Sequence, residues 1–111
     1  MAGEYREELD VLTAKVTATN TTKVDLVAAP SAGRICPRTI ILSNNDTVAH
    51  RFDLCDGTTV KFSLWVATKT SQIFKPAGWK LTATTALKFA TDAAATTTEP
   101  DASIEYDLAT G

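Results

Sequence analysis

Side chains that could perform chemistry are few and scattered in this 111-residue chain. His50 is the only histidine, which excludes a metal site built from several histidines. It lies on the apolar side of an alternating stretch, where a buried and hydrogen-bonded histidine is the expected role. Asp53 and Asp56 flank a turn and could pair as carboxylates, but turn chemistry already accounts for Asp56. We therefore predict no catalytic residue and no enzymatic activity.

The sequence signals for a metal site or a redox site are equally weak. Asn44-Asn45-Asp46 offers the oxygen atoms that calcium prefers, but no acidic cluster surrounds it and its composition is typical of a turn. Cys36 and Cys55 are too few for a disulfide framework, and their spacing matches no metal motif. We expect both thiols to be free and structural, although they could lie on neighbouring strands. We predict no metal and no cofactor.

The charge of the chain limits its partners. The net charge is −2, with acidic residues concentrated in residues 1–10 and 92–107 and basic residues between Arg34 and Lys80. A general nucleic-acid binder needs a dense basic surface, so we expect no nucleic-acid partner. No stretch approaches the roughly 18 apolar residues of a membrane helix, so we expect no membrane contact. The acidic first residues do not resemble a secretory leader, so we expect either synthesis and folding in the cytoplasm or a leader that has been removed.

The strongest structural signal is a period-two apolar pattern on both sides of Asp56-Gly57. Such alternation predicts two strands with one buried face. A two-residue Asp-Gly turn would mix the two faces. We therefore predict a three-residue loop, Cys55-Asp56-Gly57, that sets Phe52 opposite Val60. The side chains expected to face inward are Phe52, Leu54, Val60, Phe62, Leu64 and Leu81.

Other short apolar stretches alternate with Gly, Pro and Asn turn signals along the chain. Strands are predicted at residues 12–19, 23–28, 34–43, 71–75, 79–84, 87–90 and 103–108. Because proline cannot donate to a ladder, Pro37 predicts an edge position or a bulge. Seven to nine short strands at this spacing predict an all-β antiparallel sandwich, Ig-like or jelly-roll-like. We expect residues 12–111 to form this single domain and residues 1–11 to form an N-terminal arm.

Trp65 is the sharpest candidate for a contact residue. By alternation it lies on the same polar face as Arg51 and Lys61. A large indole on a polar face is either covered by the arm or a loop of its own chain, or it anchors an interface. The sequence leaves both interpretations open.

Four segments together resemble a known group of proteins. They are small residues and Gly before a basic-apolar strand (29–35), a Ser-Asn-Asn-Asp turn (41–47), an Asp-Gly hairpin (52–58) and a Gly-aromatic strand (76–81). This pattern resembles small β-sandwich proteins encoded among the structural genes of tailed bacteriophages and prophages. It spans about residues 26–90.

The resemblance implies a virion protein, and the size suggests a capsid cement or decoration protein made in the host cytoplasm and located on the capsid surface. Its partners would be the major capsid protein and neighbouring copies of itself, as a homo-oligomer on the lattice. Expected partner contacts lie in the arm and on the Trp65 face, at Tyr5, Arg6, Leu9, Arg51, Lys61 and Trp65. The alternatives are a tail, baseplate or fibre-associated virion domain and, in another class, a carbohydrate-binding sandwich module.

Overall fold

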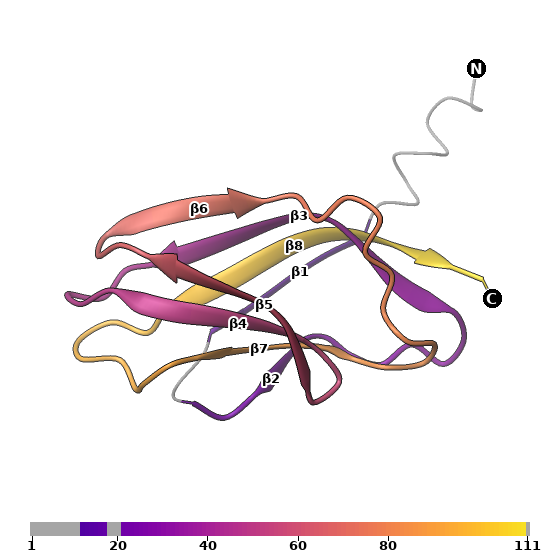
Figure 1. The fold of residues 1–111 in the computed structure, drawn as a ribbon, viewed down its shortest axis with the longest axis horizontal. Coiled ribbons are helices and arrows are strands. Elements are labelled where there is room, and N and C mark those ends of the chain that lie inside the picture. Colours follow the sequence, from indigo (N-terminus) through magenta and orange to yellow (C-terminus); the bar gives the residue numbers. More distant parts are fainter. Residues whose placement is uncertain (1–11, 18–20, 111) are drawn as a thin grey trace, which may run out of the picture.

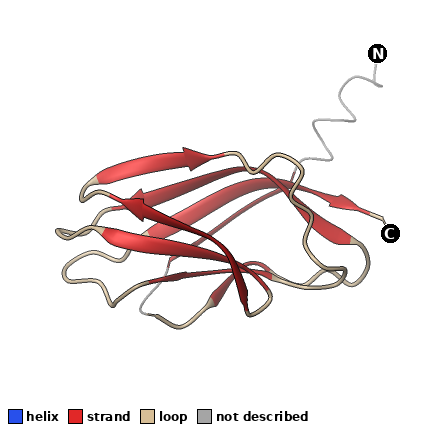
Figure 2. Cartoon of the chain, viewed as in Figure 1, coloured by secondary structure: helices blue, strands red, loops and turns tan. Residues whose placement is uncertain are grey.

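The computed structural model describes residues 12–17 and 21–110. All regular structure in these two ranges is β-strand, as Figure 2 shows. Eight strands form two antiparallel sheets of four, which confirms the predicted all-β sandwich. The predicted arm, residues 1–11 with Tyr5, Arg6 and Leu9, lies outside the described residues. The strands are β1 (Leu12–Thr17), β2 (Val24–Val27), β3 (Arg34–Asn44), β4 (His50–Asp56), β5 (Thr59–Val66), β6 (Thr70–Phe74), β7 (Leu87–Thr91) and β8 (Asp101–Ala109).

The pairing of the strands is nested around the β4–β5 hairpin. β4 pairs with β5, β3 with β6, β2 with β7 and β1 with β8, so the chain forms one long antiparallel ribbon. Two further pairings, β3 with β8 and β4 with β7, complete sheets in the orders β1-β8-β3-β6 and β2-β7-β4-β5. This is the arrangement of a jelly roll rather than of an Ig domain. Figure 1 shows the two sheets as stacked layers.

The core lies between the two layers and is made by the alternate residues that the strand pleat turns inward. Phe52 of β4 and Phe89 of β7 stack near its centre, with ring centroids 5.6 Å apart. Each fully buried Leu, Ile or Phe of this kind contributes about 1.5–3 kcal/mol relative to an exposed one. The buried apolar cluster comprises Leu26, Val27, Ile35, Ile40, Leu42, Phe52, Leu54, Val66, Leu81, Leu87, Phe89, Ala102 and Ile104.

The predicted register of the β4–β5 hairpin is wrong. The strands meet through the two-residue turn Gly57-Thr58, and a bulge at Lys61 separates the pairs Cys55–Val60 and Leu54–Phe62. The extra residue brings Phe62 onto the inward face, which resolves the mixing of faces that the sequence pattern implied.

The observed register changes the partner of Phe52 and the orientation of Val60. Phe52 lies opposite Leu64 instead of Val60. Val60 lies opposite Cys55 on the outer face and is 45% exposed, so its predicted inward orientation is also wrong. Phe62 and Leu64 do pack against the core, as expected.

Two other predictions have opposite outcomes. Pro37 lies beside a register shift between β3 and β8, which confirms the expected bulge. Residues 79–84 form no strand and are a connection held by single hydrogen bonds. The Leu81 N–H donates to the Ile35 carbonyl at 3.0 Å, and the Thr84 N–H donates to the Gly33 carbonyl at 2.8 Å. Leu81 is nevertheless fully buried, as predicted.

Gly33, in the turn before β3, is a position that only glycine fits. Its φ is 85°, and a Cβ atom there would stand 2.6 Å from the Ala109 carbonyl oxygen, part of the paired β8 backbone. Gly78 has a similar φ of 79° but open space around the position of a Cβ atom. These two glycines separate the cost of the left-handed backbone from the cost of a steric clash.

We predict that Gly33→Ala lowers the free energy of unfolding clearly more than Gly78→Ala does. The left-handed backbone alone costs a non-glycine residue about 1–2 kcal/mol, whereas Gly33→Ala must also displace the end of β8. Urea unfolding of the two variants measures the difference. Equal losses would contradict the close approach of Gly33 to Ala109.

Candidate functional site

Trp65 is the most exposed aromatic side chain in the described part of the chain, at 61%. It lies on β5 directly opposite Arg51 of β4, on the outer face of the sheet β2-β7-β4-β5. Neither the β7–β8 loop nor any other described segment covers it to the extent that the first interpretation of the sequence required. Coverage by a loop is thereby excluded for the described segments, whereas coverage by the arm concerns residues 1–11, which lie outside the described residues.

Arg51 is held in place beside Trp65 by a two-pronged ion pair. Its Nε and Nη2 atoms lie 3.0 and 3.2 Å from the two carboxylate oxygens of Asp53. Ser63 Oγ donates to the same carboxylate at 2.7 Å. The Asp53 carboxylate raises the pKa of Arg51, which stays charged. The contacts of Arg51 and Ser63 with Asp53, next to the Trp65 indole, are thus already formed in the isolated chain.

Lys61 does not join this pair. It is the extra residue of the β5 bulge and is exposed, so its ammonium group stays in solvent. A lysine and a bulge on an edge strand are features that oppose accidental pairing with another sheet edge. The structure thus places Arg51 and Trp65 together and leaves Lys61 four residues before Trp65 along β5. It does not describe Tyr5, Arg6 or Leu9.

A second polar cluster is buried at one end of the sandwich, and the sequence did not reveal it. His50 is 1% exposed, and each of its ring nitrogens meets a carboxylate. Nε2 lies 2.7 Å from Asp46 Oδ2, and Nδ1 lies 3.0 Å from Asp92 Oδ1. His50 is therefore a satisfied buried histidine, as expected. Its two partners are not apparent from the sequence, because the Asn44-Asn45-Asp46 pattern indicates only a turn.

Asp46 ties three loops together. Its carboxylate accepts backbone N–H bonds from Thr96 at 2.7 Å and Thr97 at 2.8 Å in the β7–β8 loop. Its own carbonyl accepts the hydroxyl of Thr68, in the β5–β6 turn, at 2.6 Å. Asn44 adds bonds to the carbonyls of Val48 and Val66. Three connections at the left-hand end of Figure 1 therefore share one buried anchor.

The charges of this cluster follow from its hydrogen bonds. Burial alone would raise the pKa of Asp46, but bonds from His50 and three backbone N–H groups outweigh it and hold that pKa far below 3.8. Burial would lower the pKa of His50, but its bonds to the two carboxylates raise it above 6.5. Hydrogen bonds from His50 and the Arg51 backbone likewise outweigh burial and lower the pKa of Asp92. Because each ring nitrogen of His50 faces a carboxylate oxygen, the geometry favours the doubly protonated imidazolium.

This arrangement favours a structural role over chemistry. Both nitrogens of His50 are engaged, so neither is left to accept a proton from a substrate. In residues 12–17 and 21–110, no group of three His, Cys, Asp or Glu side chains is arranged to hold a metal ion. Cys36 and Cys55 are free and lie on β3 and β4, which belong to different sheets. Burial raises the pKa of the Cys55 thiol, which makes it less reactive.

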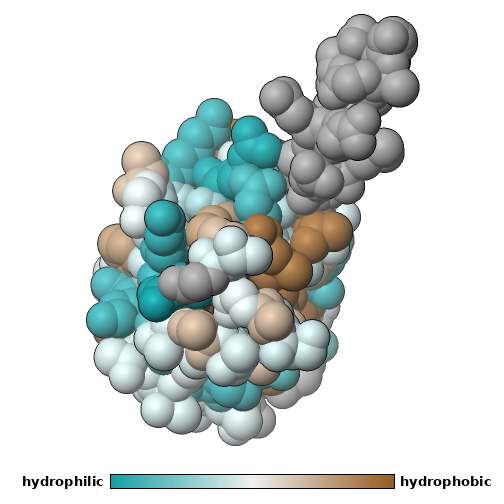
Figure 3. Space-filling view, turned by 90° about the vertical axis from the view of Figure 1, so that its right-hand side faces the viewer, coloured by the Kyte–Doolittle hydropathy of each residue, from teal (hydrophilic) through white to brown (hydrophobic). Residues whose placement is uncertain are grey.

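The opposite end of the sandwich offers a smaller apolar surface. Figure 3 looks onto this end and shows a dark brown area among white, tan and teal side chains. Leu12 at the start of β1 and Leu108 near the end of β8 are 36% and 47% exposed. No helix in the described ranges is long and apolar enough to span a bilayer.

Comparison of the chain with protein-family models, with curated proteins and with solved structures found no match. The resemblance to phage sandwich proteins therefore stays an interpretation of the sequence.

We predict that stability is highest between about pH 4 and pH 6.5. The pKa of His50 is raised on folding, so its contribution is complete below its ordinary value of 6.5 and is lost as the pH rises through the raised value. The pKa values of Asp46 and Asp92 are lowered, so their contribution is present above 3.8 and is lost as the pH falls toward the lowered values. The melting temperature as a function of pH measures both limbs.

The variant His50→Gln isolates the alkaline limb. It should reduce stability by about 3–5 kcal/mol at pH 5.5, because a buried carboxylate loses its counter-charge. It should also flatten the decline above pH 6.5. Since His50 is the only histidine, an NMR titration of the wild-type imidazole reads its pKa directly. A value at or below 6.5 would contradict the charged cluster.

Proposed function

We propose that the chain is a non-enzymatic phage virion protein, a capsid cement or decoration protein that bridges major capsid subunits on the outside of the shell. The observation that carries the proposal is Trp65, 61% exposed on a sheet face that an Arg51–Asp53 ion pair orders. Exposed tryptophans of this kind dominate the energy of protein interfaces when a partner buries them. Because the surrounding strands are already fixed, little conformational entropy is lost on docking.

The mechanism would be mechanical. Each copy would bury a modest interface, and repetition over the lattice would make the summed attachment strong. Residues 1–11, with Tyr5, Arg6 and Leu9, would add contacts across a subunit boundary. Arg51 and Lys61 would contribute salt-dependent contacts at the rim of the Trp65 interface. This division of roles matches a shell protein that resists outward pressure without catalysing a reaction.

A tail, baseplate or fibre-associated position would use the same surface and is the first alternative. A carbohydrate-binding module is the second, and the aromatic side chains argue against it. Such modules stack sugar rings on several exposed aromatics. In the described residues, Trp65 alone has that exposure, because Trp79 is half-buried and packs edge-on against Phe62 with ring centroids 4.9 Å apart.

The proposed location is tested on intact particles. Particles of the phage or prophage that encodes the chain should contain it in a high copy number, in a fixed ratio to the major capsid protein. Quantitative mass spectrometry of gradient-purified particles measures that ratio. A few copies that remain with isolated tails would support the tail or baseplate alternative, and absence from the particles would reject a virion role.

We predict that Trp65→Ala weakens attachment to capsid shells that lack the protein by roughly 2 kcal/mol, or about 30-fold in Kd. Because Trp65 is exposed, its loss should change the free energy of unfolding by no more than about 0.5 kcal/mol. Shell-binding isotherms and thermal unfolding of the same variant separate the two effects.

Leu108→Ala is the matched control, since Leu108 is 47% exposed on the other sheet and should keep wild-type attachment. Arg51→Ala should weaken attachment less than Trp65→Ala, with an effect that disappears at high salt. Unchanged attachment of Trp65→Ala would reject the anchor.

A further inference from the structure

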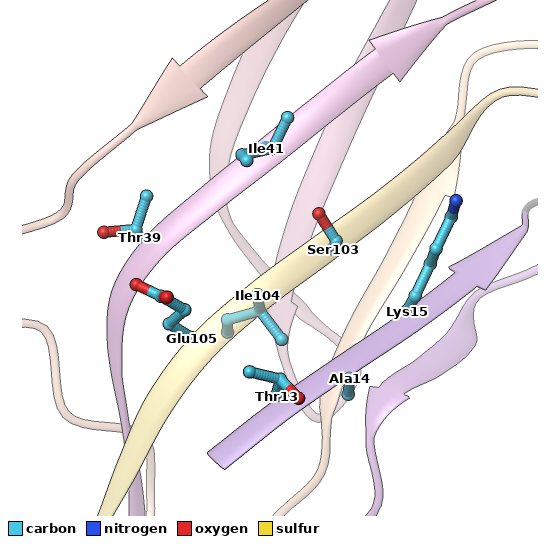
Figure 4. Close-up of a pocket in the computed structure, with 8 residues that line it drawn as sticks. All are labelled: Thr13, Ala14, Lys15, Thr39, Ile41, Ser103, Ile104 and Glu105. Carbon is cyan, nitrogen blue, oxygen red and sulfur yellow. The ribbon is translucent and has the colours of Figure 1, made fainter. Parts of the chain in front are cut away.

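The outer face of the sheet β1-β8-β3-β6 bears a protruding apolar side chain, Ile73, and a hollow on the far side of the neighbouring strand β3. Ile73 of β6 is 63% exposed and lies directly opposite Ile41 of β3, which is 38% exposed. On the other side of Ile41, β8 carries the small residue Ser103. The hollow above Ser103 has a volume of about 470 Å³. Figure 4 shows Ser103 between Ile41 and Lys15, among the residues that line the hollow.

These side chains form one row across the sheet. The registers place Ile73, Ile41, Ser103 and Lys15 beside one another on β6, β3, β8 and β1. Neighbouring strands are about 4.8 Å apart, so Ile73 and Ser103 lie at equal distances on either side of Ile41. An axis along β3 therefore exchanges the position of the protruding Ile73 with that of the hollow.

We propose that this face binds the same face of a second copy of the chain across a two-fold axis that runs along β3. Ile41 of each copy then lies near the axis and meets its counterpart. Ile73 of each copy enters the hollow above Ser103 of the other. A closed two-fold contact needs such self-complementarity, in which each surface feature faces its own complement.

The charges on the face have the same symmetry. Glu105 lies on β8 opposite Thr39, on the side of β3 that holds the hollow. Lys75 directly follows Phe74, the last residue of β6, whose partner on β3 is Ile40, the neighbour of Thr39. Both are exposed, and neither forms an ion pair with another residue in the described part of the chain. The proposed axis brings Glu105 of one copy to Lys75 of the other, twice per dimer.

The area of the face sets the affinity expected for the dimer. The four strands have six, nine, eleven and five residues, so at about 3.4 Å per residue and about 4.8 Å per strand the face covers roughly 500 Å². This is somewhat below the 800 Å² or so that each partner buries in a standard interface. The dimer should therefore be weak and concentration-dependent.

This inference goes beyond the proposed function, because it concerns the opposite sheet from Trp65 and requires no capsid. Sedimentation equilibrium of the isolated full chain between about 10 µM and 1 mM tests it, across the range of weak complexes. The weight-average mass should rise from that of the monomer toward twice that value. A chain that stays monomeric throughout, or that forms larger species without a plateau at the dimer, would overturn the proposal.

Substitutions test which side chains meet in the proposed dimer. Ile73→Asp should remove dimerisation, and the matched control Val60→Asp, on the outer face of the other sheet, should leave it unchanged. Glu105→Lys and Lys75→Glu should each weaken the dimer by about tenfold, since each brings like charges together. The double variant should restore the wild-type constant. Dimerisation by Ile73→Asp, its loss in Val60→Asp, or no restoration in the double variant would overturn the proposed contact.

Discussion

Nested antiparallel pairing around the turn at Gly57-Thr58 is the constraint on which the other features of this protein depend. The pairs β3–β6, β2–β7 and β1–β8 lie successively farther from the β4–β5 hairpin along one ribbon. The ribbon folds over on itself to make the two sheets. The same pairing gathers the β3–β4, β5–β6 and β7–β8 connections at one end. Asp46 and Thr96, fifty residues apart, meet there for this reason.

The buried charges at that end are stabilised by their partners. An isolated carboxylate in the interior costs several kcal/mol, so Asp46 is tolerated only because His50 and backbone N–H groups surround it. Those partners come from separate loops, so the charge also holds the loops together. The same end of the sandwich adjoins β4 and β5, the strands that carry Arg51 and Trp65. β4 carries both His50 of the buried cluster and Arg51 of the proposed docking face.

The two proposed interfaces occupy opposite outer faces of the sandwich. Trp65 belongs to the sheet β2-β7-β4-β5, and Ile41 and Ile73 belong to the sheet β1-β8-β3-β6. A copy docked through Trp65 would still present its other face, so attachment and self-association need not compete. Two linked attachment sites also bind more strongly than one, because the second contact forms at a high effective concentration.

The sequence by itself determined the all-β class, most of the strands, an edge position or a bulge at Pro37 and the burial of Leu81, because period-two alternation and proline chemistry are local properties. It also placed Trp65 on a polar face, but only the tertiary structure decided that this indole is exposed while Trp79 packs against Phe62. The sequence also did not predict the bulge at Lys61 or the pairing of His50 with Asp46 and Asp92. Register and buried charge depend on which strand or loop lies alongside, and distant parts of the chain supply those neighbours.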